Sequence, residues 1–579
     1  MTENNQDPIS TSEIQNGEVS LTFSEASGLQ EVPGGNRSTW HDQVGDSEVD
    51  TSGDPPIGLG SPSKFARQQS KIQQISESQV EDAAEGSPDR VDSPAVFDEI
   101  EAAIDVASCS VDNLTLTRSD SWDEAREHQH LLVTKRVHIF VLSDAGKPIY
   151  TRHGSEEALC SLFGVMQTLV SSVSTHRVRH RSTSTSPTPE GDDRLHSFQY
   201  RTWRCVFLHE SPLILVGAFK AYNNRSTAGS TLNQVSLSSA RSQLYAVYAQ
   251  ILSILTQRQL ERAFEQKQNF DLRRLLSGTQ KQLDNIVTLA NTEPAVMLGG
   301  IRCLAMPALV RDALQSAIVQ SANQLKIKNL VFAVVLARRQ LVALVRLRKY
   351  NLAPCDFHVL VNLVECMNQS FRNVETWTPV CLPRFDNTGF LHAHISYLSD
   401  NSEACLVLLT VERTHSAFHG LATMRTRIIE RLQKAKMLTQ LNDMCNSSTC
   451  AVRLSKIGIP SLWHFLYKNR FSSHVCASAF EPPFVSVDEQ TQLMDRYRYV
   501  IDRVHNYADN DTQQPLRILF VPTHRFTVLS WVTSNFELYA AFNPLVSTQS
   551  AIAKIDKLMK WLLKEQDRLF LPPSAPTLG

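Results

Sequence analysis

Two histidines and three cysteines are the side chains of this chain that most invite a chemical role. His392 and His394 lie two positions apart on a predicted strand, so both would face one side of a sheet and could bind a metal together. No cysteine or acidic pair lies near them in sequence, which favours a structural role. Cys355, Cys366 and Cys381 are interpreted as small buried hydrophobic residues and not as nucleophiles.

Motifs for covalent chemistry are absent from the sequence. It contains no P-loop, no HExxH, no GxSxG, no GxGxxG after a strand and no kinase signature. We therefore predict no bond-making catalysis, no cofactor and no metal. The 11 cysteines include no CxxC pair and no signal peptide precedes them, which predicts free thiols in a cytosolic compartment. No apolar run approaches 18 residues, so we expect any membrane association to be peripheral or mediated by a partner.

Charge is distributed very unevenly along the 579 residues. Residues 1–130 carry 7 Lys/Arg against 26 Asp/Glu, a net of −19, and the remainder carries 50 against 33, a net of +17. The first 130 residues are also nearly empty of aromatic side chains, so they are predicted to form a disordered acidic arm. Such an arm can fold back onto a basic body or remain a solvated tail that touches nothing.

The chain after residue 130 repeats one theme three times: short strands, a helix, more strands and a long helix. In the first block a hairpin at about 136–152 turns at Asp144-Ala-Gly146, and a helix is predicted from Ser155 to about Ser174. A polar insert at 175–196 follows, then strands at about 198–209 and 213–221 and a helix at about 239–266.

The second and third blocks follow the same order. The second has a hairpin of 329–338 and 340–349, a helix after Pro354, strands near 376–383, 389–398 and 403–411, and a helix at about 416–440. The third has helices near 460–468 and 487–508, strands near 516–522, 526–533 and 536–542, and a last helix at 548–568. Strands clustered before helices predict an α+β fold with helices on mostly antiparallel sheets.

The first-block helix is more hydrophobic than a helix lying on its own sheet requires. Its apolar residues cover far more than a stripe of about 100°. They are Ala158, Leu159, Leu162, Phe163, Val165, Met166, Leu169, Val170 and Val173. The excess indicates either a second contact with another protein or burial between two layers of the same domain.

Five ordered segments resemble those of the SAND family, which contains the Mon subunit of the Mon–Ccz complex. They span about residues 133–571 and are not related to one another. They are Arg136–Leu159, Gln266–Gly278, Glu375–Pro383 with Phe390–Tyr397, Gly458–Pro460 with His464–Lys468, and Lys557–Trp561 with Asp567–Phe570.

The resemblance implies that each block is a longin-like domain. The expected organisation is a regulatory acidic arm at 1–130, a first longin-like domain at 131–270 and a helical connector at 271–325. A second longin-like domain at 326–445 and a third at 446–579 complete it. The first domain is expected to contact the partner and the GTPase.

The resemblance also implies a function. The Mon–Ccz complex promotes nucleotide exchange on late-endosomal Rab GTPases, so a Ccz-type longin protein and such a Rab are the expected partners. The expected location is the cytoplasm, with peripheral recruitment to endosomal and lysosomal membranes. An early-endosomal Rab, a phosphoinositide surface and a third subunit are left open as further partners, and no nucleic acid is expected. The alternative function is a longin-type adaptor or tether that binds Rabs and lipids without promoting exchange.

The expected interface lies on the first-block helix and on one tryptophan. Its residues are Ser155, Glu156, Glu157, Leu159, Leu162, Phe163 and Met166, with Trp377 as an aromatic anchor whose alternative is an ordinary core position. A basic patch for lipid or for the acidic arm is expected on the second-block hairpin. Its residues are Arg338, Arg339, Arg346, Arg348 and Lys349, whose alternative is solvated surface charge.

Overall fold

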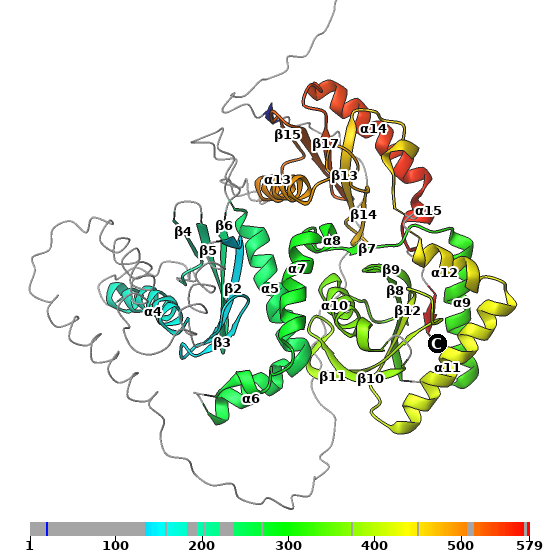
Figure 1. Ribbon diagram of the computed structural model, residues 1–579, viewed down its shortest axis with the longest axis horizontal. Helices are drawn as coiled ribbons and strands as arrows, with labels where there is room; N and C mark the ends of the chain where they lie inside the picture. The colour runs from blue at the N-terminus through cyan, green and yellow to red at the C-terminus, as the bar shows by residue number, and fades with distance from the viewer. Residues whose placement is uncertain are drawn as a thin grey trace, which may run out of the picture. The chain divides into compact units, whose positions relative to one another are not determined.

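Three β-sheets, each covered by helices, make up the described part of the chain (Figure 1). The computed structural model describes residues 19–20, 134–156, 159–181, 194–200, 203–220, 235–267, 270–327, 329–371, 374–447, 451–505, 515–572 and 576–578. The predicted α+β class with antiparallel sheets flanked by helices is confirmed.

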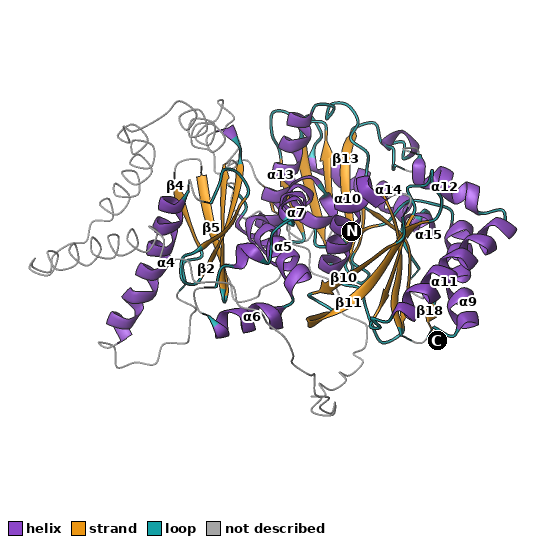
Figure 2. Ribbon diagram, turned by 60° about the horizontal axis from the view of Figure 1, so that its bottom comes forward, coloured by secondary structure: helices purple, strands orange, loops and turns teal. Residues whose placement is uncertain are grey.

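The first sheet has the strand order β3-β2-β6-β5-β4, and every neighbouring pair is antiparallel. Its strands are β2 (Val137–Ser143), β3 (Pro148–Thr151), β4 (Ser197–Tyr200), β5 (Trp203–Glu210) and β6 (Leu213–Lys220). Helix α4 (Cys160–Arg181) covers one face and α5 (Leu237–Leu255) covers the other (Figure 2). Because both faces are covered, β2 is buried along almost its whole length.

The second sheet has the order β10-β11-β12-β8-β9-β18. Its main strands are β8 (Leu330–Ala337), β9 (Gln340–Leu347), β10 (Thr376–Leu382), β11 (Asp386–Tyr397) and β12 (Cys405–Thr410). Helix α10 (Pro354–Phe371) lies on one face, and α9 (Ala308–Leu325) and α11 (His415–Lys434) lie on the other. Helix α12 (Leu438–Asn446) follows α11.

The third sheet has the order β1-β15-β16-β17-β13-β14-β7. Its main strands are β13 (Leu462–Asn469), β14 (His474–Ala477), β15 (Ile518–Val521), β16 (Thr527–Val532) and β17 (Phe536–Phe542). Helix α13 (Val487–His505) covers one face, and α14 (Thr548–Lys564) with α15 (Gln566–Leu569) covers the other.

A helical segment joins the first two sheets. It contains α6 (Gln257–Gln266), a 3₁₀ turn at Leu272–Arg274, α7 (Gln280–Thr292) and α8 (Pro294–Met297). One hydrophobic cluster runs from the first sheet through α5, α7 and α10 to the second sheet. The first two domains therefore share a core at this junction.

Three two-residue strands lie at the edges of the larger sheets. β7 (Ile301–Arg302) pairs in parallel with β14, and the next residue, Cys303, bridges to Leu341 of β9. β18 (Thr577–Leu578) pairs in parallel with the other end of β9. β1 (Val19–Ser20) pairs antiparallel with β15. Apart from β1, the predicted disordered arm lies outside the described residues.

Several predicted helices differ from the structure. The helix predicted near 460–468 is wrong: these residues form β13, whose two faces both pack into the core, so no alternation distinguished it from a helix. The helix predicted from Ser155 begins at Cys160 in the structure, and in the turn before it Glu156 accepts the backbone N–H of Thr151 (3.3 Å). That helix ends at Arg181, inside the stretch predicted as a polar insert.

Two long predicted helices are each interrupted. The helix predicted at 239–266 breaks at Thr256, which has φ 53° and caps α6 by accepting the N–H of Gln259 (3.3 Å). The helix predicted at 416–440 breaks near Lys436, which has φ 54°. A residue with positive φ ends a helix because the chain changes direction there, and the N–H groups that follow no longer reach the last carbonyls of the helix.

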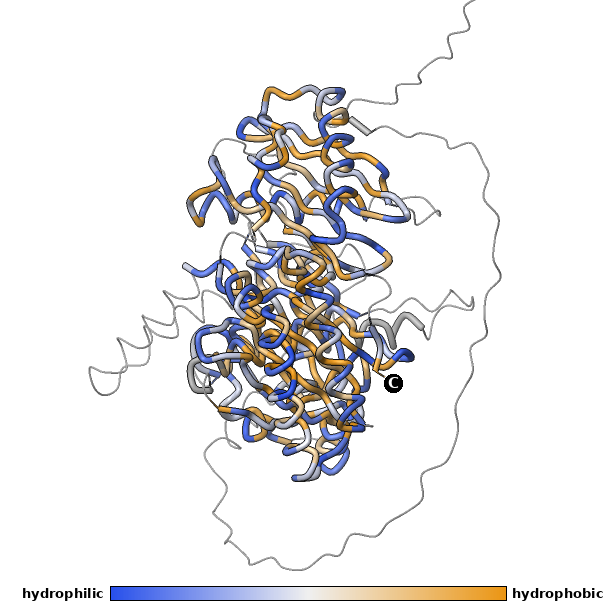
Figure 3. Tube along the Cα trace, turned by 90° about the vertical axis from the view of Figure 1, so that its right-hand side faces the viewer, coloured by the Kyte–Doolittle hydropathy of each residue, from blue (hydrophilic) through white to orange (hydrophobic). Residues whose placement is uncertain are grey.

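Hydrophobic residues concentrate inside the folded part and hydrophilic residues mainly at its margin (Figure 3). Among the described residues, no helix has the length and apolar character needed to cross a bilayer.

Candidate interaction site

The inner face of α4 explains part of its unusual hydrophobicity. Leu159, immediately before the helix, and Phe163, Met166 and Val170 within it are buried against the first sheet. Their spacing places them on one helical face. Phe163 meets Phe140 of β2 edge to face, with ring centroids 5.8 Å apart. Leu159, Phe163 and Met166, predicted to contact a partner, therefore contact the chain's own sheet.

A second apolar stripe on α4 is only half-buried. It contains Leu162, Val165 and Leu169, spaced at i, i+3 and i+7, and continues to Val173. Leu162 lies at its border and also packs against the sheet cluster. This stripe is the hydrophobic excess that the sequence predicted, and it lies beside the fully buried positions, roughly a quarter of a turn around the helix.

Small residues border the second stripe. Ser161, Gly164, Thr168 and Ser172 are exposed, and a Cβ added at Gly164 would meet no atom within 4 Å. Thr168 donates to the carbonyl of Gly164 (2.9 Å) and Ser172 to that of Thr168 (2.8 Å). Because these hydroxyls already have acceptors, another protein can cover this face without leaving their protons unpaired. The outer face of α4, defined as Leu162, Gly164, Val165, Thr168 and Leu169, is thus suited to close packing.

The turn before α4 holds the remaining predicted residues of the first domain. Ser155 accepts the backbone N–H of Leu159 (3.2 Å), and Glu156 is engaged by Thr151. Glu157 lies outside the described residues. Ser155 and Glu156 are half-buried, so they lie beside the start of α4 but are partly occupied by local contacts.

Trp377 lies in the second domain, on β10, and the structure does not bring it to α4. Its ring stacks on His392 (centroids 5.5 Å apart) and meets Phe418 edge to face (5.9 Å). The indole is half-buried and packs against the core beneath α9 and α11. Trp377 therefore combines a core contact with an accessible surface.

His394, two residues from His392, is fully buried. Its Nε2 lies 3.0 Å from Glu375 Oε2, and burial lowers its pKa although Glu375 opposes that shift. Arg425 approaches the other oxygen of Glu375 (3.4 Å). Within the described residues no three His, Cys, Asp or Glu side chains form a metal-binding group. His394 has the surroundings of a structural residue.

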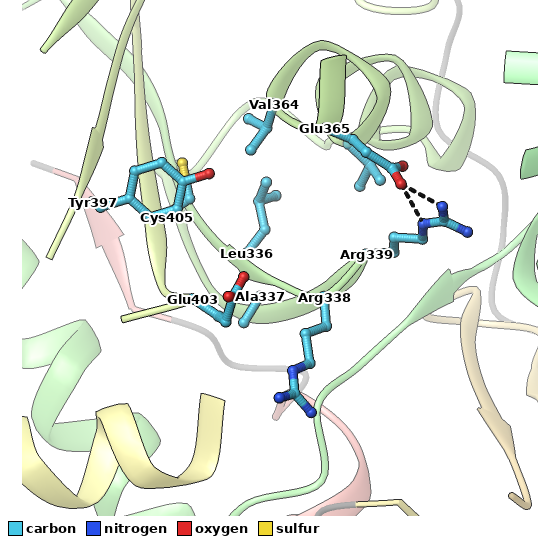
Figure 4. Close-up of a pocket in the computed structure, with 10 residues that line it drawn as sticks. Leu336, Ala337, Arg338, Arg339, Val364, Glu365, Tyr397, Glu403 and Cys405 are labelled. Atoms are coloured by element: carbon cyan, nitrogen blue, oxygen red, sulfur yellow. Dashed lines mark hydrogen bonds and ion pairs between the residues drawn. The ribbon is translucent and has the colours of Figure 1, made fainter. Parts of the chain in front are cut away.

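Arg338 and Arg339 form the turn between β8 and β9, where both have positive φ (50° and 65°). They border an open cavity of about 210 Å³ whose wall is mainly apolar, with Leu336, Val361, Val364, Tyr397 and Cys405 (Figure 4). Arg339 pairs with Glu365, and Arg338 points away from the cavity and donates to the carbonyl of Asn446. Both guanidinium groups are therefore engaged by the protein itself.

Arg346, Arg348 and Lys349 lie at the other end of β9. Arg346, the nearest of them, is seven positions after Arg339 along the strand, or roughly 23 Å at about 3.3 Å per residue. Arg346 donates to the carbonyls of Tyr350 (2.5 Å) and Arg348 (3.2 Å). The structure thus divides the predicted basic patch into two separate groups.

Sequence reasoning missed a buried amide network where the first two domains meet. Asn362 of α10 donates to Gln250 Oε1 of α5 (2.8 Å) and to the carbonyl of Gln282 (2.8 Å). Asn285 of α7 donates to Asn362 Oδ1 (2.8 Å) and to Glu365 (3.2 Å), the residue that pairs with Arg339. An apolar helix interrupted by a single amide was the available signal, but the partners are too distant in sequence to be inferred.

Comparison with known proteins gives three consecutive matches to one family. Models described as the first, second and third longin domains of FUZ, MON1 and HPS1 match residues 137–286, 328–430 and 461–566. A structural comparison with a bacteriophytochrome from R. palustris covers 74% of this chain and 95% of that one, but at 9% identity and a TM-score of 0.15 it carries no argument.

Individual relatives are similar over about three quarters of this chain. Vacuolar fusion protein MON1 homolog A of Gallus gallus is 38% identical over 459 residues, which are 79% of this chain and 76% of that protein. The Homo sapiens protein of the same name is 40% identical over 434 residues, covering 75% of this chain and 60% of that protein. Protein SAND of Takifugu rubripes is 38% identical over 436 residues, covering 75% and 76%.

Proposed function

The chain belongs to the MON1/SAND family of proteins with three longin domains, and from that premise we propose that it is one subunit of a two-protein guanine nucleotide exchange factor for a late-endosomal Rab GTPase. Its relatives are named vacuolar fusion proteins. In this role the chain promotes conversion of early to late endosomes and fusion of endosomes or autophagosomes with lysosomes. It acts from the cytoplasm, recruited peripherally to those membranes.

The observation that carries the proposal is the outer face of α4. The helix already buries one apolar stripe on its own sheet and presents a second, with small satisfied residues beside it. A longin domain of a Ccz-type partner is the occupant that we propose for this face. The paired first domains then present a joint surface to the GTPase, and the turn at Ser155 and Glu156 lies at the start of that helix.

The proposed mechanism needs no general acid or base. An exchange factor accelerates release by binding the nucleotide-free GTPase more tightly than the loaded one. It holds the first switch region away from the nucleotide and displaces groups that coordinate Mg²⁺ or phosphate. An acceleration of about 1000-fold needs only ~4 kcal/mol of differential binding. One buried aromatic contact and one rearranged ion pair suffice for that amount.

The alternative function, a longin-type adaptor or tether without exchange activity, is supported by the accessible part of Trp377. A half-buried aromatic stack on a sheet edge of another domain offers a contact for an active GTPase that is separate from α4. The two functions differ in which nucleotide state of the GTPase they bind most tightly.

The test measures the affinity of the full chain, co-purified with its Ccz-type partner, for a late-endosomal Rab in three states. An exchange factor binds the nucleotide-free Rab at least 100-fold more tightly than the GDP-bound or GTP-analogue-bound Rab. Preference for the GTP-analogue form, with weak binding to the nucleotide-free form, would reject the exchange function and support the adaptor.

A further inference from the structure

Strand β15 is the last full strand on one side of the third sheet, and its sequence is entirely apolar. Ile518, Leu519, Phe520 and Val521 are all buried. Leu519 and Val521 join the cluster beneath α13, whereas Phe520 joins the cluster beneath α14. On its inner side β15 is paired with β16 along its whole length. An apolar edge strand with free backbone groups on its outer side is an aggregation hazard that proteins cover or blunt.

A segment of the acidic arm lies on this edge. Val19 is opposite Phe520 and Ser20 is opposite Leu519, in antiparallel register (Figure 1, where the short blue strand lies beside β15). The segment comes from the far end of the sequence, because 113 residues separate Ser20 from Thr134, where the described body begins. The pairing is therefore a long-range contact and not a local hairpin.

The arm's sequence at this point has the composition of a strand. Val19, Leu21 and Phe23 alternate with Ser20, Thr22 and Ser24. Val19 and Thr22 are β-branched and Phe23 is aromatic, and strands favour both kinds of residue. Around them the arm consists largely of Ser, Gln, Gly, Pro and acidic residues. The alternation predicts a strand longer than the two residues of β1.

Elsewhere this fold closes sheet edges in the same manner. The opposite edge of the third sheet is covered by β7, and β9, the last long strand of the second sheet, is covered by Cys303 and β18. Each cover is a strand or bridge of one or two residues from a connecting or terminal segment. The Val19–Ser20 strand covers the edge of β15 in the same way that β18 covers the edge of β9.

We propose that β15 is a strand-binding edge and that its occupant is the segment of the same chain that contains Val19 and Ser20. Backbone hydrogen bonds hold the segment, in the register that places Val19 opposite Phe520 and Ser20 opposite Leu519. The acidic arm is thereby tethered to the third domain. A partner that adds a strand to β15 must first displace this segment.

The same chain is a better source of the strand than a second copy. The 113 residues between Ser20 and Thr134 are enough to span a domain of this size, since the root-mean-square reach expected of a random chain of that length is about 60 Å. Tethering also gives the segment a high effective concentration, which a separate molecule at micromolar concentration does not match. Pairing within one chain is therefore expected to be independent of protein concentration.

The test follows amide hydrogen exchange in the peptide that contains residues 518–521, using the full-length chain with its partner. Val19→Pro removes a backbone donor and disfavours the paired conformation, and it lies in the arm, so it leaves the folded body intact. Val49→Pro, which also follows a glutamate in the arm, is the matched control. We expect exchange at least tenfold faster in this peptide for Val19→Pro and no change for Val49→Pro.

Three results would overturn the proposal. They are equal exchange in wild type and Val19→Pro, equal acceleration by Val49→Pro, and protection that disappears on tenfold dilution, which would identify a second copy as the source. A second readout checks the register: Ser20→Cys with Leu519→Cys should form a disulfide, because directly opposed residues lie at bridging distance. Ser52→Cys with Leu519→Cys should not, and equal yields from both pairs would contradict the pairing.

Discussion

At the scale of single residues, Gly164 offers the sharpest probe of the outer face of α4. It is exposed, and a side chain there meets no atom of its own domain within 4 Å. Gly164→Arg should therefore leave the fold intact and even favour the helix, because glycine is the poorer helix former by up to about 1 kcal/mol. We expect it to weaken pairing with the Ccz-type partner at least 100-fold, or about 2.7 kcal/mol. Titration calorimetry of the two subunits measures this.

The matched control for that change is Gly420→Arg. Gly420 also lies within a long helix, α11, and also has open space around a built Cβ, but it is on the second domain. Its pairing affinity should equal that of the wild type. Equal weakening by the two substitutions would mean that the outer face of α4 is not the partner surface.

A buried histidine predicts the acid sensitivity of the third domain. His464 is fully buried, and burial, with a smaller contribution from Arg302, lowers its pKa to about 3. The unfolded chain has the ordinary value near 6.5, so between about pH 6.5 and 3 it binds one proton more than the folded chain. The free energy of unfolding should fall by about 1.4 kcal/mol per pH unit on acidification because of this residue alone.

His464→Gln removes that titration. Urea unfolding from pH 7 to pH 4.5 should show a shallower loss of stability for the variant, by about 1.4 kcal/mol per pH unit. His358 and His474, whose pKa values burial lowers to about 4, still titrate and contribute to the loss that remains. Parallel pH profiles for variant and wild type would contradict this assignment.

Contacts between individual side chains were the feature of the structure that the sequence predicted least well. The sequence predicted the apolar excess of α4, because a helical stripe depends only on residues near one another. It predicted neither the Gln250–Asn362 contact nor the environment of His464, because these depend on which distant segments the fold brings together.

At the scale of elements, one arginine joins the end of the chain to the second domain. Arg311 of α9 is almost fully buried, and every hydrogen-bond acceptor of its guanidinium found in the described structure is a backbone carbonyl. The acceptors are Leu304 (2.8 Å), Asp567 (2.9 Å), Phe570 (2.9 Å), Arg568 (3.2 Å) and Val342 (3.3 Å). The side chain thus ties β9 and the region of α15 to α9.

Arg311→Met should destabilise the protein by about 3–5 kcal/mol, because several buried carbonyls lose their donor at once. Arg431→Met is the control, since the partners of Arg431 within the described residues are the surface side chains of Gln320 and Gln324, and a loss under about 1 kcal/mol is expected. Thermal unfolding measures both. Similar melting temperatures for the two variants would show that the buried guanidinium contributes little.

Elements were predictable where their pattern was local. The two hairpins at β2–β3 and β8–β9 were predicted from short apolar segments that are adjacent in sequence and joined by a tight turn. Strand β13 was mistaken for a helix because both its faces are buried, and the edge strands β7 and β18 were missed because two residues carry no period. The helix breaks at Thr256 and Lys436 depend on positive φ angles, which a threonine or a lysine in the sequence does not predict.

At the scale of the whole molecule, the separation of charge predicts regulation by the arm. Residues 1–130 carry a net of −19 and the rest of the chain +17. An acidic arm near a basic body competes with acidic surfaces of a GTPase or a membrane. Deleting residues 1–130 should therefore raise the exchange rate of the complex, measured with liposome-bound Rab. An unchanged or lower rate would remove this role of the arm.

The three-domain organisation was the most predictable property of the molecule. Three repeats of strands followed by helices indicated three α+β units, and the resemblance to the SAND family identified them as longin-like domains. The sharing of a core by the first two domains, through α5, α7 and α10, was not predictable. Each of these helices has apolar residues on more than one side. The sequence does not show which neighbouring element packs against each side.

We propose that this chain and a longin partner together release nucleotide from a late-endosomal Rab. The direct measurement is release of a fluorescent GDP analogue from a panel of purified Rabs, with the chain alone, with the wild-type pair, and with the pair that carries Gly164→Arg. The variant pair is used at a concentration below the Kd of its two subunits, so that it remains dissociated. We predict acceleration of about 1000-fold for one late-endosomal Rab, only with the wild-type pair. Tight Rab binding by the pair without acceleration of release would contradict the proposed exchange function.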